Sequence, residues 1–181
     1  MQNKLFQNSG NYRKLFSYQK AEAIFDITCY FCNHFLRKSD RTIDQMVQAA
    51  RSGKQNIVEG CAASAISKET EIKLVGVAKA SLHELLIDYE DYLRTRKHRQ
   101  WEMNSREMTA MRNLGRKHNE SAFFMGLVET RPPETIANMA ICLINQTDYL
   151  LSKQLDSLAK QFAKEGGIRE RMTKMRMENR K

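Results

Sequence analysis

Apolar residues recur at three- and four-residue steps through most of the N-terminal half, the spacing that places side chains on one face of a helix. This pattern predicts a first helix over residues 17–38. Ser39 and Asp40 supply N-cap side chains for a second helix, which continues to the small-residue stretch at 61–67. Ser67, with acidic residues in the turn that follows it, predicts a third helix that runs to about Arg96.

A fourth long helix is predicted in the C-terminal part of the chain. Pro132 and Pro133 are typical of a helix start, and the same apolar spacing continues from there to Gly166. Between residues 97 and 131 the spacing is interrupted by glycines and polar residues. We therefore predict a helical insertion in this interval.

Together these elements predict an all-α protein: an antiparallel four-helix bundle over residues 17–165, with the helical insertion at about 97–131 before the fourth helix. Residues 1–16 are a polar arm in this interpretation, and residues 166–181 are a short basic C-terminal tail. Only 8 glycines and 2 prolines among 181 residues leave too few turn formers for a many-stranded sandwich or barrel. The third helix carries apolar residues over a wider arc than a bundle interior uses, so we expect a homo-oligomer.

Charge changes the picture by suggesting a partner. The chain has 30 Lys and Arg against 21 Asp and Glu, a formal charge of +9, which favours nucleic acid as a partner. The candidate contacts form two clusters and a weaker pair: Arg94, Arg96, Lys97 and Arg99 beside Trp101; Arg169, Arg171, Lys174 and Arg176 in the tail; and Arg51 with Lys54. The alternative interpretation is that Lys and Arg at a helix end only complement the helix dipole.

Residues that could carry catalysis form no recognisable set. Cys29 and Cys32 have the spacing of half a zinc site, but no second pair with suitable spacing follows, so we expect neither metal nor cofactor. No phosphate-binding loop or serine-hydrolase elbow occurs, and we expect no enzyme activity. The competing hypothesis is a metal-dependent phosphoryl-transfer enzyme that uses Glu84, Asp88 and Asp91, which share a helix face.

The expected compartment is the cytoplasm. No apolar run approaches the ~20 residues that span a bilayer, and the polar start lacks the apolar core of a secretory signal. Four cysteines in a chain of this length fit reduced thiols better than a disulfide framework. We therefore expect no membrane partner.

Two segments carry a resemblance to a known family: DQMVQAARSGKQNIVEG at 44–60 and VAKASLHEL at 77–85. They resemble the bacterial four-helix-bundle family that includes proteins encoded in ribosomal-RNA intervening sequences and the accessory variability determinant of diversity-generating retroelements. The matching residues are Ala49, Ala50, Ser52, Asn56, Ile57, Glu59 and Gly60 in the first segment, and Ser81, Leu82, Glu84 and Leu85 in the second. Where family members have an Arg-Arg pair, this chain has Val47 and Gln48. The long fourth helix ending in GGIRERM resembles the subgroup with a suffix domain.

The resemblance implies a pentamer that binds nucleic acid, with a reverse transcriptase or another encoded protein as a further partner. We therefore expect a non-catalytic oligomeric accessory protein that binds RNA or DNA. The alternative is a protein-binding adaptor without nucleic-acid affinity.

The shared polar residues themselves suggest a structural role. Ser52, Asn56 and Glu59 lie on one face of the second helix, and Ser81 and Glu84 lie on one face of the third. We expect them to form a polar layer between the two helices that fixes their register, because a buried polar group without its partner costs about 1–3 kcal/mol. Gly53, with the small residues Ala49, Ala50 and Ala62, predicts a close approach between helices of the bundle.

Overall fold

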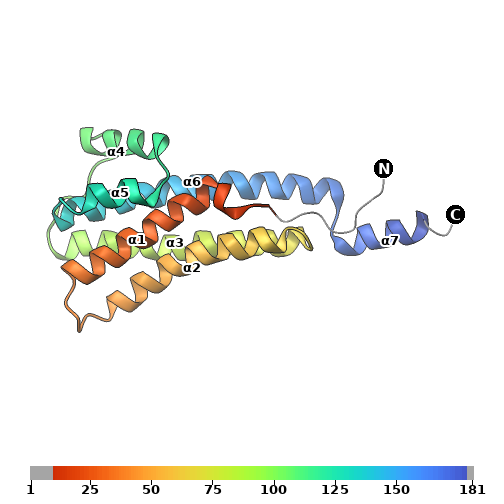
Figure 1. The fold of residues 1–181 in the computed structure, drawn as a ribbon, viewed down its shortest axis with the longest axis horizontal. Helices are drawn as coiled ribbons and strands as arrows, with labels where there is room; N and C mark the ends of the chain where they lie inside the picture. The colour runs from red at the N-terminus through yellow and green to blue at the C-terminus, as the bar shows by residue number, and fades with distance from the viewer. Residues whose placement is uncertain (1–9, 179–181) are drawn as a thin grey trace.

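The computed structural model describes residues 10–178, without the side chains of residues 165, 171, 174 and 178. Within this range the protein is all-helical and contains no strand (Figure 1). The elements are the 3-10 helix η1 (Tyr12–Lys14) and the α-helices α1 (Phe16–Phe35), α2 (Thr42–Ala63), α3 (Lys68–Thr95), α4 (Arg106–Lys117), α5 (Ser121–Val128), α6 (Pro133–Glu165) and α7 (Ile168–Glu178). The first predicted helix therefore ends at Phe35, three residues before Lys38.

Four long helices pack side by side in the order in which they occur along the chain. α1 contacts α2, α2 contacts α3, α3 contacts α6, and α6 contacts α1. Consecutive members of this set run in opposite directions (Figure 1). The two shorter helices of residues 97–131 lie outside it, α5 against α1 and α4 against α6.

Local sequence explains where the long helices begin and end. The Ser67 hydroxyl accepts a hydrogen bond from the backbone N–H of Thr70 at 3.2 Å and so caps α3. Pro133 begins α6, where its fixed φ and missing N–H carry no cost. Gly166, with φ of 70°, ends α6 in a conformation that favours glycine.

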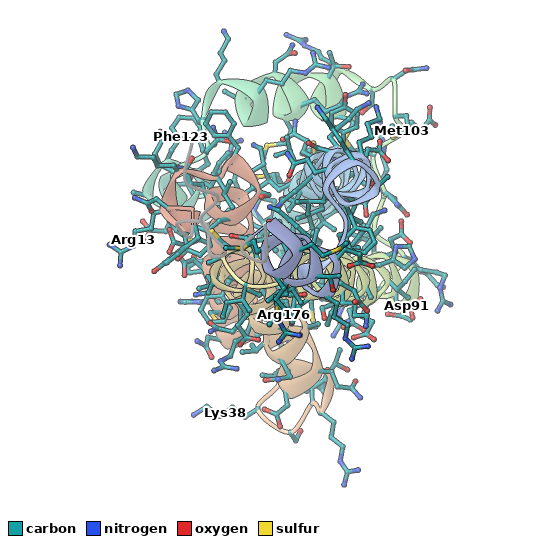
Figure 2. The ribbon with its side chains drawn as sticks, turned by 90° about the vertical axis from the view of Figure 1, so that its right-hand side faces the viewer. Arg13, Lys38, Asp91, Met103, Phe123 and Arg176 are labelled. Atoms are coloured by element: carbon teal, nitrogen blue, oxygen red, sulfur yellow. The ribbon has the colours of Figure 1, made fainter. Side chains whose placement is uncertain are left out.

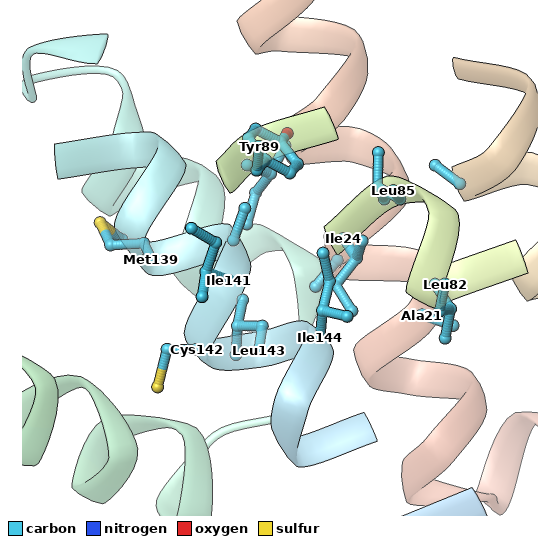
Figure 3. Packing of buried hydrophobic residues seen from close by; sticks show 14 of the residues in the cluster. Ala21, Ile24, Leu82, Leu85, Tyr89, Met139, Ile141, Cys142, Leu143 and Ile144 are labelled. Carbon is cyan, nitrogen blue, oxygen red and sulfur yellow. The ribbon is translucent and has the colours of Figure 1, made fainter. Parts of the chain in front are cut away.

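The centre of the core is the first half of α6. Every residue from Ile136 to Ile144 is buried, because α1 and α3 cover one side of the helix and α4 covers another. In Figure 3, Cys142 leaves α6 on the side of α4, and Ile144 faces Ile24 of α1. A run that is buried on every side and apolar except for Asn138 is typical of a helix that is surrounded by others.

A buried asparagine attaches the segment before α4 to this core. Asn138 of α6 is fully buried. Its Oδ1 accepts a hydrogen bond from the Trp101 backbone N–H at 2.8 Å, and its Nδ2 donates to the Arg99 carbonyl at 2.9 Å. Because both polar ends of the amide are satisfied by the chain before α4, the path of residues 99–101 is fixed.

Hydropathy of the described helices agrees with the sequence on one further point. No helix within residues 10–178 is both long enough and apolar enough to cross a membrane.

Candidate nucleic-acid interface

The end of α3 adopts a backbone conformation that is unusual for its sequence. Lys97 has a φ of 58°, in the left-handed region that favours glycine. The Lys97 N–H bonds to the Arg94 carbonyl at 3.2 Å, and the His98 N–H bonds to the Leu93 carbonyl at 2.9 Å. These two bonds form a Schellman motif that ends the helix. A lysine at this position costs about 1 kcal/mol relative to glycine.

Arg96 lies beside the connection between α1 and α2. Its guanidinium stacks over the Tyr92 ring, 4.1 Å from the centroid. Hydrogen bonds from Thr42 lower the pKa of Asp40, and the charge of Arg96 lowers it further. Since Asp40 belongs to the connection between α1 and α2, the end of α3 and this connection are neighbours.

The connection contributes three exposed cations, Arg37, Lys38 and Arg41. The side chain of Lys38 projects away from the helices (Figure 2). With the exposed Arg96 and Lys97 they form a set that we call the cationic end: Arg37, Lys38, Arg41, Arg96 and Lys97. No ion pair within residues 10–178 involves any of the five.

Sequence reasoning missed Arg37, Lys38 and Arg41, although the signal was present. In an up-and-down arrangement the end of the first helix and the end of the third lie at the same end of the molecule. The basic residues at 37–41 should therefore have been grouped with those at 94–99.

Two residues of the predicted cluster at the end of α3 have acidic partners. The Arg94 guanidinium lies 2.7 Å from Asp91, and Arg99 lies 3.3 Å from Glu107. Both pairs are exposed, and such pairs contribute at most about 1 kcal/mol to stability. Their effect on the surface is to neutralise charge, so Arg94 and Arg99 add less to the positive potential than Arg96 and Lys97 do.

The predicted tail cluster lies at the opposite end of the molecule (Figure 1). Arg169 and Arg176 are exposed on α7, whereas the side chains of Arg171 and Lys174 lie outside the described part of the chain. The 33 residues of α6 separate α7 from the cationic end, a length of about 50 Å at 1.5 Å per residue. The two clusters therefore cannot contact the same few nucleotides.

The weaker candidates differ from one another. Arg51 is exposed on α2. Lys54, in contrast, places its ammonium 4.2 Å from the ring centroid of Phe25 on α1. Lys54 is half-buried in this contact, whereas Arg96 remains exposed over Tyr92, so Lys54 is the poorer candidate for an external partner.

Three residues of the predicted polar layer lie together between α2 and α3. The hydroxyl oxygens of Ser52 and Ser81 are 2.9 Å apart. Asn56 Nδ2 donates to the Ser52 carbonyl at 2.9 Å and contacts its hydroxyl at 3.2 Å. Beside them, an added Cβ on Gly53 would lie 2.7 Å from Leu82 Cγ, so the two helices approach as closely as their side chains allow.

Glu59 and Glu84, which we expected in the same layer, are exposed instead. The register of the antiparallel pair explains this difference. Gly60, the residue after Glu59, lies opposite the side chains of Leu74 and Val75 and the carbonyl of Glu71, so the facing side chains nearest this level are apolar. A carboxylate at such a level turns toward water, because burying it without a partner is costly.

The three acidic residues of the competing enzyme hypothesis lie on the outer side of α3. Burial raises the pKa of Asp88, and the charges of Asp91 and Glu84 raise it further. Asp91 also pairs with Arg94. Across residues 10–178, no group of three or more His, Cys, Asp or Glu side chains could hold a metal ion.

The cysteine pair lies inside α1. Cys32 is buried, and this burial raises the pKa of its thiol to about 12. Burial also raises the pKa of Cys29. A thiol that resists deprotonation is a poor metal ligand, and both side chains behave as small apolar groups.

Comparisons with known proteins assign no family and no function to the chain. No protein-family model, no curated protein and no solved structure matches the chain.

Proposed function

We propose that this protein is a non-catalytic accessory protein that binds RNA or DNA through the cationic end. The observation that carries the proposal is that two exposed basic segments, 37–41 and 96–97, lie at the same end of the molecule although they are far apart in the sequence (Figure 1). Cations that form no ion pair among the described residues are available to neutralise phosphates and release their counterions.

The conformation of Lys97 supports this assignment. Residue 97 has a φ of 58°, which favours glycine, but the residue is a lysine. Local backbone strain of this kind concentrates at functional sites. A positive charge at this position is therefore the property that compensates for the lower stability.

We further propose that α1, α2, α3 and α6 form the antiparallel four-helix bundle of the family that the sequence resembles, and that copies of the chain assemble through the outer face of α3. Val77 and Ile87 on that face are 47% and 44% exposed, and Ala80 lies exposed between them. The resemblance implies a pentamer and a reverse transcriptase as partner. An assembly presents several cationic ends to one polyanion, so weak contacts add up to strong binding.

The test is a salt titration of RNA and DNA binding by the full chain, with Arg37→Ala/Lys38→Ala/Lys97→Gly as the variant. Glycine suits the conformation of residue 97, so the variant loses three charges without losing the end of α3. We expect the slope of log affinity against log salt to shrink by about 2 to 3, because each neutralised phosphate contributes about 0.7 to 0.9.

The matched control is Lys153→Ala/Lys160→Ala/Lys164→Ala, which removes the same charge from exposed positions in the second half of α6. Its slope should equal that of the wild type. Equal losses in the two variants would reject the cationic end as the interface. Absence of binding by the wild type at low salt would reject the nucleic-acid proposal and favour the adaptor.

Light scattering tests the assembly separately. We expect the wild type to be larger than a monomer at micromolar concentration, and Val77→Glu/Ile87→Glu to reduce its mass, because each change places a charge in the proposed contact. A monomeric wild type, or an unchanged mass in the variant, would contradict assembly through α3.

A further inference from the structure

A cavity of about 670 Å³ lies between the start of α1, α4 and the middle of α6. It exists because α4 is attached to α6 at a few points and is not packed along its whole length. One attachment is Gln146, whose Nε2 donates to the Arg112 carbonyl at 2.9 Å. The buried Lys20 of α1 attaches the end of α4 to α1, because its ammonium donates to the Gly115 and His118 carbonyls. The volume is in the range of small-molecule sites, about 300–1,000 Å³.

The cavity is bordered by apolar side chains that are exposed to solvent. Phe16, Met103 and Tyr149 are 60%, 62% and 61% exposed, and all three line it. Figure 2 shows Met103 at the margin between α4 and α6. Seven large apolar side chains in residues 10–178 are strongly exposed, and three of them surround this one opening. Exposed apolar groups that gather in this way indicate a ligand rather than chance.

The charges that line the cavity are all positive. Lys20, Arg112 and Arg116 contribute to the lining, whereas no Asp or Glu does. The guanidinium of Arg112 donates to the Met103 carbonyl and so fixes the edge of the opening. Arg116 has no acidic partner among the described residues and is exposed beside the opening. A ligand with a negative group would find a partner here, and one with a positive group would be repelled.

We propose that this cavity binds a small anionic amphiphile, a molecule with an apolar acyl or aryl body and one carboxylate, sulfonate or phosphate group. The apolar body of the ligand packs against Phe16 and Tyr149 and against the side chains of Met103, Met108 and Cys142. Its acidic group pairs with Arg116. This site is separate from the cationic end and does not depend on nucleic-acid binding. Burial of Lys20 lowers its pKa to about 8, so Lys20 remains mostly protonated at neutral pH and adds to the positive field.

Three probes that share one alkyl chain and differ in their head group test whether the ligand needs a negative charge. Calorimetry with decanoate, decanol and decylamine below their micelle concentrations compares an anion, a neutral molecule and a cation. We expect decanoate to bind at least about tenfold more tightly than decylamine, a difference that one charge-assisted contact can supply. Anilinonaphthalene sulfonate is a fluorescent aryl anion, and its displacement by decanoate compares the affinities of the cavity for an aryl and an acyl body. Equal affinities of decanoate and decylamine would overturn the proposal.

A pair of adjacent variants locates the site. Arg116→Glu and Lys117→Glu make the same charge change at exposed neighbouring positions of α4, but only Arg116 lines the cavity. We expect Arg116→Glu to weaken decanoate binding about tenfold and Lys117→Glu to leave it within about twofold. Equal effects of the two changes would overturn the assignment of the site.

A second pair tests the apolar part with every charge in place. Tyr149→Ala should weaken decanoate and decanol by the same factor, because it removes apolar contact and no charge. Met177→Ala, a similarly exposed apolar residue on α7 that does not line the cavity, should change neither affinity. Unchanged affinities in Tyr149→Ala would contradict a body bound in this cavity.

Discussion

Two interfaces of this protein contain a glycine at their closest point, yet one is closed and the other is open. In the contact of α2 with α3, a Cβ on Gly53 would overlap Leu82. In the contact of α4 with α6, a Cβ on Gly115 would overlap the Gln146 amide oxygen. A glycine thus lets α2 pack closely against the Leu82 side chain, and another lets α4 pack closely against the Gln146 amide.

The two interfaces differ in what surrounds the glycine. Beside Gly53, Ser52 and Ser81 bond to each other at 2.9 Å. Beside Gly115, Gln146 Oε1 is buried with no hydrogen-bond partner among the described residues, and the cavity of about 670 Å³ opens next to it. A glycine therefore sets how close two helices come, whereas matching side chains around it decide whether the interface closes.

The largest change in stability is expected from a substitution that disrupts the closed interface between α2 and α3. Gly53→Leu should reduce the free energy of unfolding by about 3 kcal/mol or more, because α2 cannot move away from Leu82 without separating the Ser52–Ser81 pair as well. Chemical denaturation measures this change.

Gly126→Leu is the matched control, since nothing lies within 4 Å of a Cβ built at Gly126 in α5. Its stability should stay within about 1 kcal/mol of the wild type, the size of the helix-propensity difference. Similar losses in the two variants would show that leucine acts through the helix itself and not through the contact with Leu82.

An intermediate effect is expected at the open interface. Gly115→Ala should destabilise by about 1–2 kcal/mol, because the added methyl displaces the Gln146 amide from the Arg112 carbonyl. Gln146→Ala removes the obstacle. In that background Gly115→Ala should be neutral or slightly stabilising, because alanine has the higher helix propensity. Additive effects in this double-mutant cycle would contradict a direct contact between the two residues.

Much of the closed interface could be predicted from the sequence. The small residue Gly53 and the hydroxyl of Ser52, one turn before Asn56, indicate where α2 approaches another helix, and Ser81 falls on the facing side of α3. Glu59 and Glu84 were predicted wrongly because helical spacing gives the face of a residue but not the level at which it meets its neighbour. That level depends on the antiparallel register, which only the packed pair defines.

The open interface could not be predicted in this way. Gly115 interrupts a helical pattern in the sequence and so suggested a break, whereas in the structure it lies inside α4. Its role depends on Gln146, which is 31 positions away and carries no local signal of the contact. Lys20 similarly reads as an ordinary surface lysine near the start of a helix, because its burial results from α4 lying over it. Sequence patterns describe one helix at a time, and these contacts exist only between helices.

The smallest expected effect concerns Lys20, which holds the end of α4 against α1. Its burial lowers its pKa from 10.5 to about 8. Between these pH values the unfolded chain keeps a proton that the folded protein has lost, so the free energy of unfolding rises with pH and the cost of the buried charge is present in full below about 8. From pH 7.5 to 9 the contribution of Lys20, taken as the difference between the wild type and Lys20→Met, should rise by about 1 kcal/mol.

Urea denaturation across this interval measures the gain, with Lys20→Met as the variant that abolishes it. The comparison with Lys20→Met is needed because burial raises the pKa of Cys142 from 9.0 to about 11. From about pH 8 the unfolded thiols ionise before the folded ones and lower stability in the wild type and in Lys20→Met alike, so the difference between the two proteins isolates Lys20. Lys160→Met, at an exposed position of α6, should keep the wild-type pH dependence. An equal rise with pH in Lys20→Met would show that another group titrates, and that the ammonium at the open interface has an ordinary pKa.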